Sequence, residues 1–141
     1  MNMRQRLNLL LLGVENVAKT VKFYEELGWK KSAAGSAEFV LFDLGGIALG
    51  VQSRDAFAKD AGYAERSCTG FPGFALAYIA RTAEEVYEVM QKAEMLGAEI
   101  AKPAQATNWG HAGYFRDSNG HLFEVVYEDG WKFDGNDNLV L

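Results

Sequence analysis

Two kinds of hydrophobic pattern follow one another along the first part of the chain. A continuous apolar run over residues 7–12, ended by Gly13, predicts a strand that is buried on both faces. Behind a possible N-cap at Asn16, apolar side chains recur at helical spacing until Gly28, which is expected to end the helix. Short strands are then predicted over residues 29–33, 38–43 and 47–52, with glycine-containing turns between them. The predicted order is β-α-β-β-β.

The same order recurs in the second part of the chain. An apolar run over residues 74–80 precedes Thr82-Ala83-Glu84-Glu85, which has the spacing of a capping box and predicts a helix that ends at Gly97. Strands are predicted near residues 99–101, 113–116 and 122–127. Alignment of Gly46 with Gly120 places Phe42 against Arg116 and Gly50 against Glu124. The repeated order predicts an α+β fold built from two duplicated βαβββ modules.

The length of 141 residues fits one domain, residues 1–141. Module one covers residues 7–52 and module two covers residues 73–127. The connector, residues 53–72, contains a stretch that predicts a short helix behind an N-cap at Ser53. The tail, residues 128–141, is too polar for a core of its own, and we expect its aromatic residues Trp131 and Phe133 to hold it against a neighbouring surface.

Composition narrows the classes of partner. The formal net charge of −5 disfavours nucleic acid, whose binding requires a positive surface, but it is compatible with a cationic small ligand. The single cysteine cannot form an internal disulfide. No apolar stretch reaches the roughly 18–20 residues that span a bilayer, and the early leucine run is too short for a signal peptide. We therefore expect a cytoplasmic protein without a membrane or nucleic-acid partner.

Two longer motifs carry a family resemblance. Residues 23–29, Phe-Tyr-Glu-Glu-Leu-Gly-Trp, and residues 113–125, Gly-Tyr-Phe-Arg-Asp-Ser-Asn-Gly-His-Leu-Phe-Glu-Val, resemble the glyoxalase/bleomycin-resistance/dioxygenase group, also called the vicinal oxygen chelate superfamily. The resemblance implies that the modules form a curved, cup-like mixed sheet with the helices on the outside. It also implies, for the metal enzymes of the group, one ligand on the first and one on the last strand of each module.

The metal positions of the group are poorly matched in this sequence. Glu124 corresponds to the last-strand carboxylate of module two, whereas the corresponding position of module one is Gly50. The opening-strand positions fall at or beside Leu9 and Phe74, and their neighbours include no histidine or carboxylate. Catalytic metal sites generally use three protein ligands, so we predict that the usual metal site is lost and that no cofactor is bound.

Five residues are candidates for a ligand site. An apolar cup would favour Glu124 as a hydrogen-bonding anchor or a general acid/base, unless its strand register points it to solvent. Trp109 and His111 lie in a polar, aromatic loop that we expect to line the pocket, and Tyr114 and Phe42 lie nearest the proposed cup. His121, after a turn, is expected to be a surface residue or a brace of that turn.

Three functions remain open. The first is a metal-free binder of the bleomycin-resistance type, which would hold a small aromatic or cationic molecule and form a homodimer. The second is a metal-dependent lyase or isomerase resembling lactoylglutathione lyase, which would need unconventional ligands such as Glu124 with His111 or His121. The third, an extradiol dioxygenase, needs two histidines and a carboxylate around iron and is the most strongly disfavoured. The sequence identifies neither the ligand nor whether a reaction is catalysed.

Overall fold

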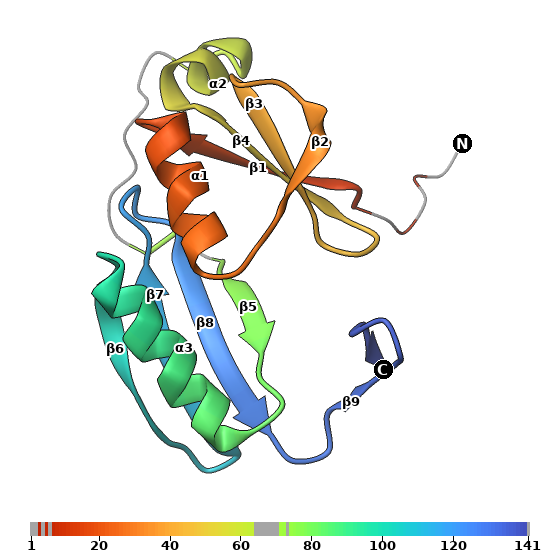
Figure 1. Cartoon of the computed structure of the whole chain (residues 1–141), viewed down its shortest axis with the longest axis vertical. Coiled ribbons are helices and arrows are strands. Elements are labelled where there is room, and N and C mark those ends of the chain that lie inside the picture. Colours follow the sequence, from red (N-terminus) through yellow and green to blue (C-terminus); the bar gives the residue numbers. More distant parts are fainter. Residues whose placement is uncertain (1–2, 4, 6, 64–70, 73, 141) are drawn as a thin grey trace. The chain divides into compact units, whose positions relative to one another are not determined.

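The structure of the chain, a computed structural model, describes residues 3, 5, 7–63, 71–72 and 74–140 (Figure 1). It divides into two compact units, Met1–Arg66 and Ser67–Leu141, and the boundary falls within the predicted connector. Each unit contains one of the two predicted βαβββ modules. The α+β class and the duplicated order of elements are confirmed.

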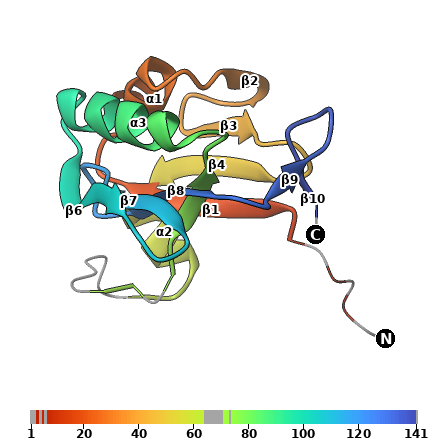
Figure 2. The same cartoon turned by 90° about the horizontal axis from the view of Figure 1, so that it is seen from below.

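The first unit is a four-stranded mixed sheet with two helices. Its elements are β1 (Leu9–Val14), α1 (Val17–Glu26), β2 (Lys31–Gly35), β3 (Phe39–Asp43), β4 (Ala48–Ser53) and α2 (Arg54–Asp60). The strand order is β1-β4-β3-β2, and the first and last strands of the module lie side by side and parallel. Helix α1 packs against β3 and β4, and α2 packs against β1 and β4 on the other side of the sheet (Figure 2).

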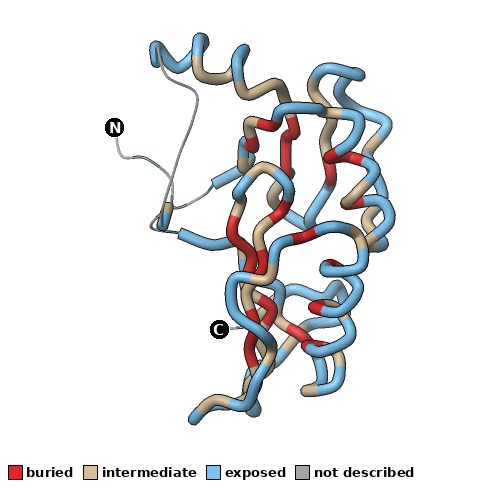
Figure 3. The backbone as a smooth tube through the Cα atoms, turned by 90° about the vertical axis from the view of Figure 1, so that its left-hand side faces the viewer, coloured by how far each residue is buried: buried red, intermediate tan, exposed pale blue. Residues whose placement is uncertain are grey.

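The core of the first unit lies between the sheet and α1. The predicted N-cap is confirmed, because Asn16 Oδ1 accepts a hydrogen bond from the Lys19 N–H at 2.9 Å. Helix α1 buries Tyr24, whose ring stacks on Trp29 with centroids 5.3 Å apart and meets the edge of Phe42. The buried positions of the strands and of the helix side that faces them appear as the red segments in Figure 3.

Local turn chemistry sets the register of the first sheet. Gly45 and Gly46 both have positive φ and form a two-residue hairpin loop, closed by a 2.8 Å hydrogen bond from the Leu44 N–H to the Ile47 carbonyl oxygen. Helix α2 begins behind the predicted N-cap Ser53, whose Oγ accepts from the Ala56 N–H at 3.4 Å. The predicted turns and the short connector helix are therefore confirmed.

The second unit repeats this arrangement and adds a short hairpin. Its elements are β5 (Leu76–Ile79), α3 (Ala83–Met95), β6 (Glu99–Ala106), β7 (Gly110–Arg116), β8 (Leu122–Glu128), β9 (Lys132–Phe133) and β10 (Leu139–Val140). The four main strands have the order β5-β8-β7-β6, with β5 parallel to β8, and α3 covers one face of β6, β7 and β8 (Figure 2).

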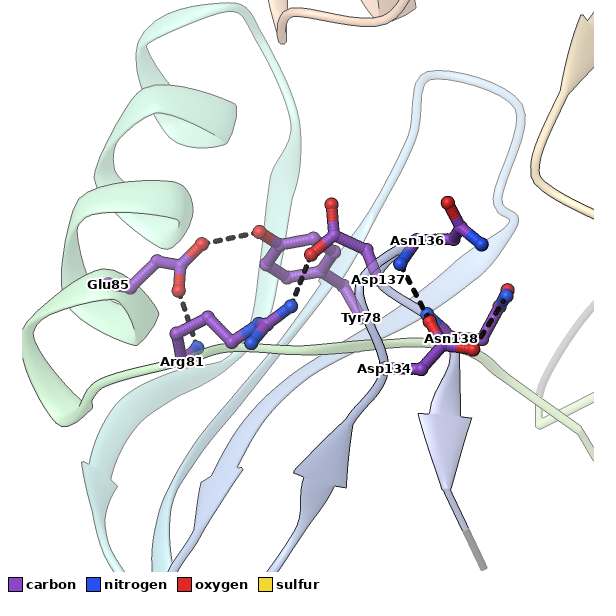
Figure 4. Close-up of polar contacts among 7 residues, drawn as sticks. All are labelled: Tyr78, Arg81, Glu85, Asp134, Asn136, Asp137 and Asn138. Atoms are coloured by element: carbon purple, nitrogen blue, oxygen red, sulfur yellow. Dashed lines mark hydrogen bonds and ion pairs between the residues drawn. The ribbon is translucent and has the colours of Figure 1, made fainter.

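The start of α3 differs in one detail from the predicted capping box. Thr82 Oγ1 accepts a hydrogen bond from the Glu85 N–H at 3.1 Å, as expected of an N-cap. The Glu85 carboxylate, however, accepts from the Arg81 N–H at 2.6 Å, one residue before the position that the motif predicts. It also accepts a hydrogen bond from the Tyr78 hydroxyl, so it connects β5 to the helix (Figure 4).

Strands β6 and β7 are longer than the sequence predicts. Pro103 argues against a strand beyond residue 101, but β6 is an edge strand, and its register shifts between Ile100 and Lys102 and again between Lys102 and Gln105. Edge strands with bulges tolerate proline because no ladder hydrogen bond is lost there. Strand β7 begins at Gly110, so His111 lies in the sheet and not in a loop.

The tail is held by one cation. The Arg81 guanidinium lies 3.9 Å from the centroid of the Phe133 ring. It also forms an ion pair with Asp137, which Figure 4 shows. The Trp131 indole N–H donates to the Glu128 carboxylate at the end of β8. Phe133 therefore contacts the body of the second unit as predicted, whereas the contact of Trp131 is with Glu128, which is both the first residue of the predicted tail and the last of β8.

Candidate functional site

The two faces of the second sheet have different surroundings. Side chains alternate between the faces along a strand, and paired residues on neighbouring strands share a face. The pairing places four residues in one row across the sheet: Ala77 in β5, Glu124 in β8, Tyr114 in β7 and Lys102 in β6. The next row on this face contains Ile79, Val126 and Ala112.

Helix α3 covers the opposite face. There the rings of Phe115 and Phe123 stack with centroids 4.9 Å apart, and a Cβ built on Gly113 would lie 3.0 Å from Met90 Cε of the helix. Residues 113, 115 and 123 are odd-numbered on their strands, whereas 114 and 124 are even-numbered. Glu124 and Tyr114 therefore lie on the face of the second sheet that α3 leaves uncovered.

Glu124 and Tyr114 form a hydrogen-bonded pair. The Tyr114 hydroxyl donates to Glu124 Oε2, and both side chains are half-buried. The hydrogen bond to the Glu124 carboxylate, followed by burial and by the charge of that carboxylate, raises the pKa of Tyr114 to about 12. The pair provides a negatively charged acceptor, oriented by a phenol. Its neighbours on this face are the apolar side chains of Ala77, Ala112 and Val126 and, beside Tyr114 on β6, the exposed Lys102. Such a pair can accept a proton or a hydrogen bond from a bound molecule.

His111 and Trp109 do not lie beside Glu124 and Tyr114. His111 is on the α3 side of the sheet, where its Nδ1 lies 3.0 Å from the Tyr87 hydroxyl oxygen and the two rings meet edge to face at 5.7 Å. Trp109 lies in the turn before β7 with 58% of its surface exposed. The structure thus separates the two residues of the predicted pocket loop from Glu124.

Phe42 is a core residue of the first unit. It is 1% exposed and packs against Tyr24 and Trp29 on the α1 side of the sheet. Helical periodicity and alternation predict burial but not which face of a strand a ring occupies. The side chain therefore supports the helix and does not line an accessible surface.

The first unit does not offer a metal donor at the position that corresponds to Glu124. A Cβ on Gly50 would lie 2.8 Å from Phe39 Cε2 and 3.1 Å from Leu11 Cδ2, so aromatic and aliphatic carbon atoms occupy the space a donor would need. The register moves the opening-strand positions from Leu9 and Phe74 to Leu11, which pairs with Gly50, and to Ala77, which pairs with Glu124. The side chains of Leu9, Leu11, Phe74 and Ala77 cannot coordinate a metal ion.

No cluster of metal-binding side chains elsewhere in the described part of the chain replaces the missing ligands. Within the described residues there is no group of three or more histidine, cysteine, aspartate or glutamate side chains arranged to hold a metal ion. His121 binds within its own turn, because its Nδ1 lies 2.9 Å from Oδ2 of Asp117. Asp117 is buried, with 4% of its surface exposed, and its carboxylate also accepts a hydrogen bond from the His121 backbone N–H. The predicted role of His121 as a turn brace is confirmed, and the residues present do not fit the metal centre that the resemblance implies.

The bond between Tyr114 and Glu124 was not predicted, although both residues were candidates. The signal for it is in the sequence. Gly120, in the left-handed conformation, ends a three-residue loop, residues 118–120, so Asp117 faces His121, and counting outward from these two residues pairs residue 114 with residue 124. A tyrosine and a carboxylate at directly paired positions are then within reach of each other.

Solved structures with the same fold are numerous. A glyoxalase-related enzyme from Fulvimarina pelagi is 25% identical, with a TM-score of 0.87 over 97% of this chain and 98% of that one. A glyoxalase/bleomycin resistance protein/dioxygenase family enzyme from Burkholderia phytofirmans PsJN is 19% identical, with a TM-score of 0.74 over 86% of this chain and 97% of that one. The fosfomycin resistance protein FosX from Listeria monocytogenes is 20% identical, with a TM-score of 0.68 over 91% and 94% of the two chains.

Other comparisons complete this picture. Comparison with curated protein sequences gave no significant match. In the described part of the chain, no helix combines the length and the hydropathy that a bilayer crossing requires. The sequence profile of one superfamily matches residues 6–125, which include the first βαβββ module and the second as far as Val125 in β8. The chain belongs to the Glyoxalase/Bleomycin resistance protein/Dioxygenase superfamily.

Proposed function

We propose that this protein binds a small aromatic or cationic molecule without a metal ion, and that Glu124 is the polar anchor of the site. The observation that carries the proposal is the hydrogen bond from Tyr114 to Glu124 on the sheet face that α3 leaves uncovered. Members of the superfamily commonly bind small molecules, and one protein of similar structure is named for resistance to fosfomycin.

The chemistry of the pair favours a ligand with a hydrogen-bond donor or a positive charge. A carboxylate accepts hydrogen bonds and attracts cations, and the hydroxyl of Tyr114 already orients one of its oxygen atoms. The apolar neighbours Ala77, Ala112 and Val126 provide contacts for the uncharged part of the ligand, and they strengthen the polar contact by excluding water.

Isothermal titration of the full chain against a panel of cationic antibiotics and aromatic amines tests this proposal. We expect at least one saturable binder, and we expect Glu124→Gln to weaken it by about 10- to 100-fold, the effect of a charged hydrogen bond worth about 1.5–3 kcal/mol. Glu88→Gln, which removes a carboxylate from the exposed side of α3, is the matched control and should leave affinity unchanged. Absence of binding at millimolar concentrations, or equal affinities for the two variants, would refute it.

Elemental analysis distinguishes the metal-free binder from the alternative function, a metal-dependent lyase or isomerase. The structure of a FosX variant from Listeria monocytogenes contains Mn(II) and 1S,2S-dihydroxypropylphosphonic acid, so a metal is used elsewhere on this fold. We expect the purified chain to carry no stoichiometric divalent metal and its binding to be unaffected by EDTA. Stoichiometric metal together with activity on a methylglyoxal–glutathione adduct would instead establish the lyase alternative.

The proposal includes two expectations about context. Members of the superfamily often dimerise, and we expect this chain to form a homodimer in the cytoplasm. Light scattering coupled to size-exclusion chromatography tests the first expectation, since a mass equal to one chain of 15.6 kDa would contradict it. Fractionation of the source cells tests the second.

A further inference from the structure

A second place for a small molecule lies in the first unit, on the side of the sheet away from α1. Eight residues line an open pocket there with a volume of about 350 Å³: Asn8, Ser32, Ala34, Leu41, Asp43, Gly46, Ile47 and Ala48. Pockets that bind drug-sized molecules usually have volumes of about 300–1,000 Å³, so this one suits a single small ligand or a fragment of a larger one.

The register explains why these residues share a face. Val51, Leu49 and Phe42 are buried, and Phe42 packs against Tyr24 of α1. Their strand neighbours therefore point to the other face, which contains the paired residues Asp43 and Ala48. The tight Gly45-Gly46 hairpin, closed between Leu44 and Ile47, ends the pocket on one side.

The floor of the pocket is apolar and continues beyond it. Leu41 pairs with Gly50, which pairs in turn with Leu11, so these three positions form a row across β3, β4 and β1. Leu11 remains 39% exposed, and the Phe39 ring lies against Gly50 on the same face. An apolar or aromatic group in the pocket would therefore find further carbon surface along this row.

Asp43 supplies the only charge among the eight lining residues. Its Oδ1 accepts a hydrogen bond from the Gly45 N–H at 2.9 Å, which orients the carboxylate. Oδ2 accepts no hydrogen bond from any residue that the structure describes, and the side chain is exposed. The polar groups of Asn8 and Ser32 lie in the same lining. A carboxylate beside an apolar floor recognises a protonated amine attached to an apolar or aromatic group.

We propose that this pocket of the first unit, formed by Leu41, Asp43 and Ala48 with the residues around them, binds small organic ammonium compounds. The site is built from β2, β3, β4, the hairpin loop between β3 and β4, and the residue before β1. It does not depend on the pair formed by Glu124 and Tyr114, which belongs to the second unit.

Titration of the ¹⁵N-labelled full chain with benzylamine, followed by two-dimensional NMR, tests the proposal. Benzylamine is the cationic probe, and benzyl alcohol and benzoate are the neutral and anionic probes of similar shape. We expect saturable shifts of the backbone amides of Leu41, Asp43 and Ala48 with benzylamine, with a Kd in the millimolar range that is typical of so small a ligand. Benzyl alcohol should bind more weakly, and benzoate should not bind.

Asp43→Asn is the decisive variant. Asparagine keeps an oxygen atom that can accept from the Gly45 N–H, so the hairpin is retained while the charge is removed. We expect about a fivefold weaker affinity for benzylamine, the size of effect that an exposed ion pair supports. Asp60→Asn, at the end of α2, removes the same charge away from the pocket and should bind like the unaltered chain.

The result separates this site from the one proposed in the second unit. Glu124→Gln should leave the benzylamine shifts at Leu41 and Ala48 unchanged, whatever it does to the other ligands. Equal affinities for Asp43→Asn and Asp60→Asn would overturn the proposal. So would benzylamine shifts confined to β7 and β8, or equal binding of the three probes.

Discussion

Replacement of Gly50 by alanine is a direct test of how the first sheet is packed. The new Cβ would lie 2.8 Å from Cε2 and 2.9 Å from Cζ of Phe39, closer than carbon atoms approach without displacement. Gly50 has no positive φ, so alanine fits the backbone of β4. Steric contact with Phe39 is therefore the main obstacle to the substitution.

Two opposing contributions set the magnitude. Glycine inside a strand costs roughly 0.5–1 kcal/mol relative to alanine, so Gly50→Ala gains that amount from the unfolded chain. Overpacking beside a ring typically costs about 1–3 kcal/mol, which outweighs the gain. We expect the free energy of unfolding to fall by about 1–2 kcal/mol. In a Phe39→Ala background the ring is absent, and the same change should raise the free energy by about 0.5–1 kcal/mol.

Urea denaturation of the four proteins in this cycle measures the effect. Gly135→Ala is the control, because a Cβ at that position meets no atom within 4 Å, and its free energy of unfolding should change by less than about 0.5 kcal/mol. The expected reversal of sign between the two backgrounds is the critical result. If Gly50→Ala destabilises both backgrounds equally, the contact with Phe39 does not explain the glycine.

Four further outcomes follow from hydrogen bonds in the second unit. Ultraviolet titration should show the Tyr114 phenol ionising at a pKa of about 12, and Glu124→Gln should lower this pKa toward 10.0, because the carboxylate is its main cause. Because folding raises the pKa of Tyr114, its protonated hydroxyl stabilises the folded state below about pH 10, and this stabilisation is lost as the pH rises through 12. In urea melts at increasing pH, Tyr114→Phe should therefore be destabilised less by alkali than the unaltered chain. Thr82→Ala removes the N-cap of α3 and should lower the free energy of unfolding in urea by about 1 kcal/mol, with Thr82→Ser restoring most of it. Asp117→Ala leaves the half-buried N–H groups of Asn119 and His121 without their acceptor and should lower the free energy of unfolding by about 1–3 kcal/mol in the same assay. A loss below about 0.5 kcal/mol would contradict the role of this carboxylate.

The duplicated fold is readable from the sequence because local signals agree with it at many points. The caps Asn16, Ser53 and Thr82 are each used as the sequence predicts, and Gly28 and Gly97 follow the helices with positive φ. These signals act within a few residues of one another. They depend little on contacts between distant parts of the chain.

Side-chain direction was less accessible from the sequence. Phe42 and His111 were both candidates for a ligand pocket, but each lies on the helix side of its sheet. A shift of one residue exchanges the two faces of a strand, and only the pairing with neighbouring strands fixes which face a helix covers. The pocket around Asp43 was missed for the same reason, because its lining comes from β2, β3 and β4 together.

The parallel pairing of the first and last strands also affects how each unit forms during synthesis. Strand β1 cannot complete its hydrogen bonds until β4 has been made, because Leu9 pairs with Ala48 and Val14 with Ser53. Until then a leucine-rich segment emerges from the ribosome without its partner and is a natural target for a nascent-chain chaperone. Contacts this distant in sequence close slowly, so each unit should form late and in one cooperative step, and a chain arrested before β4 should remain unfolded.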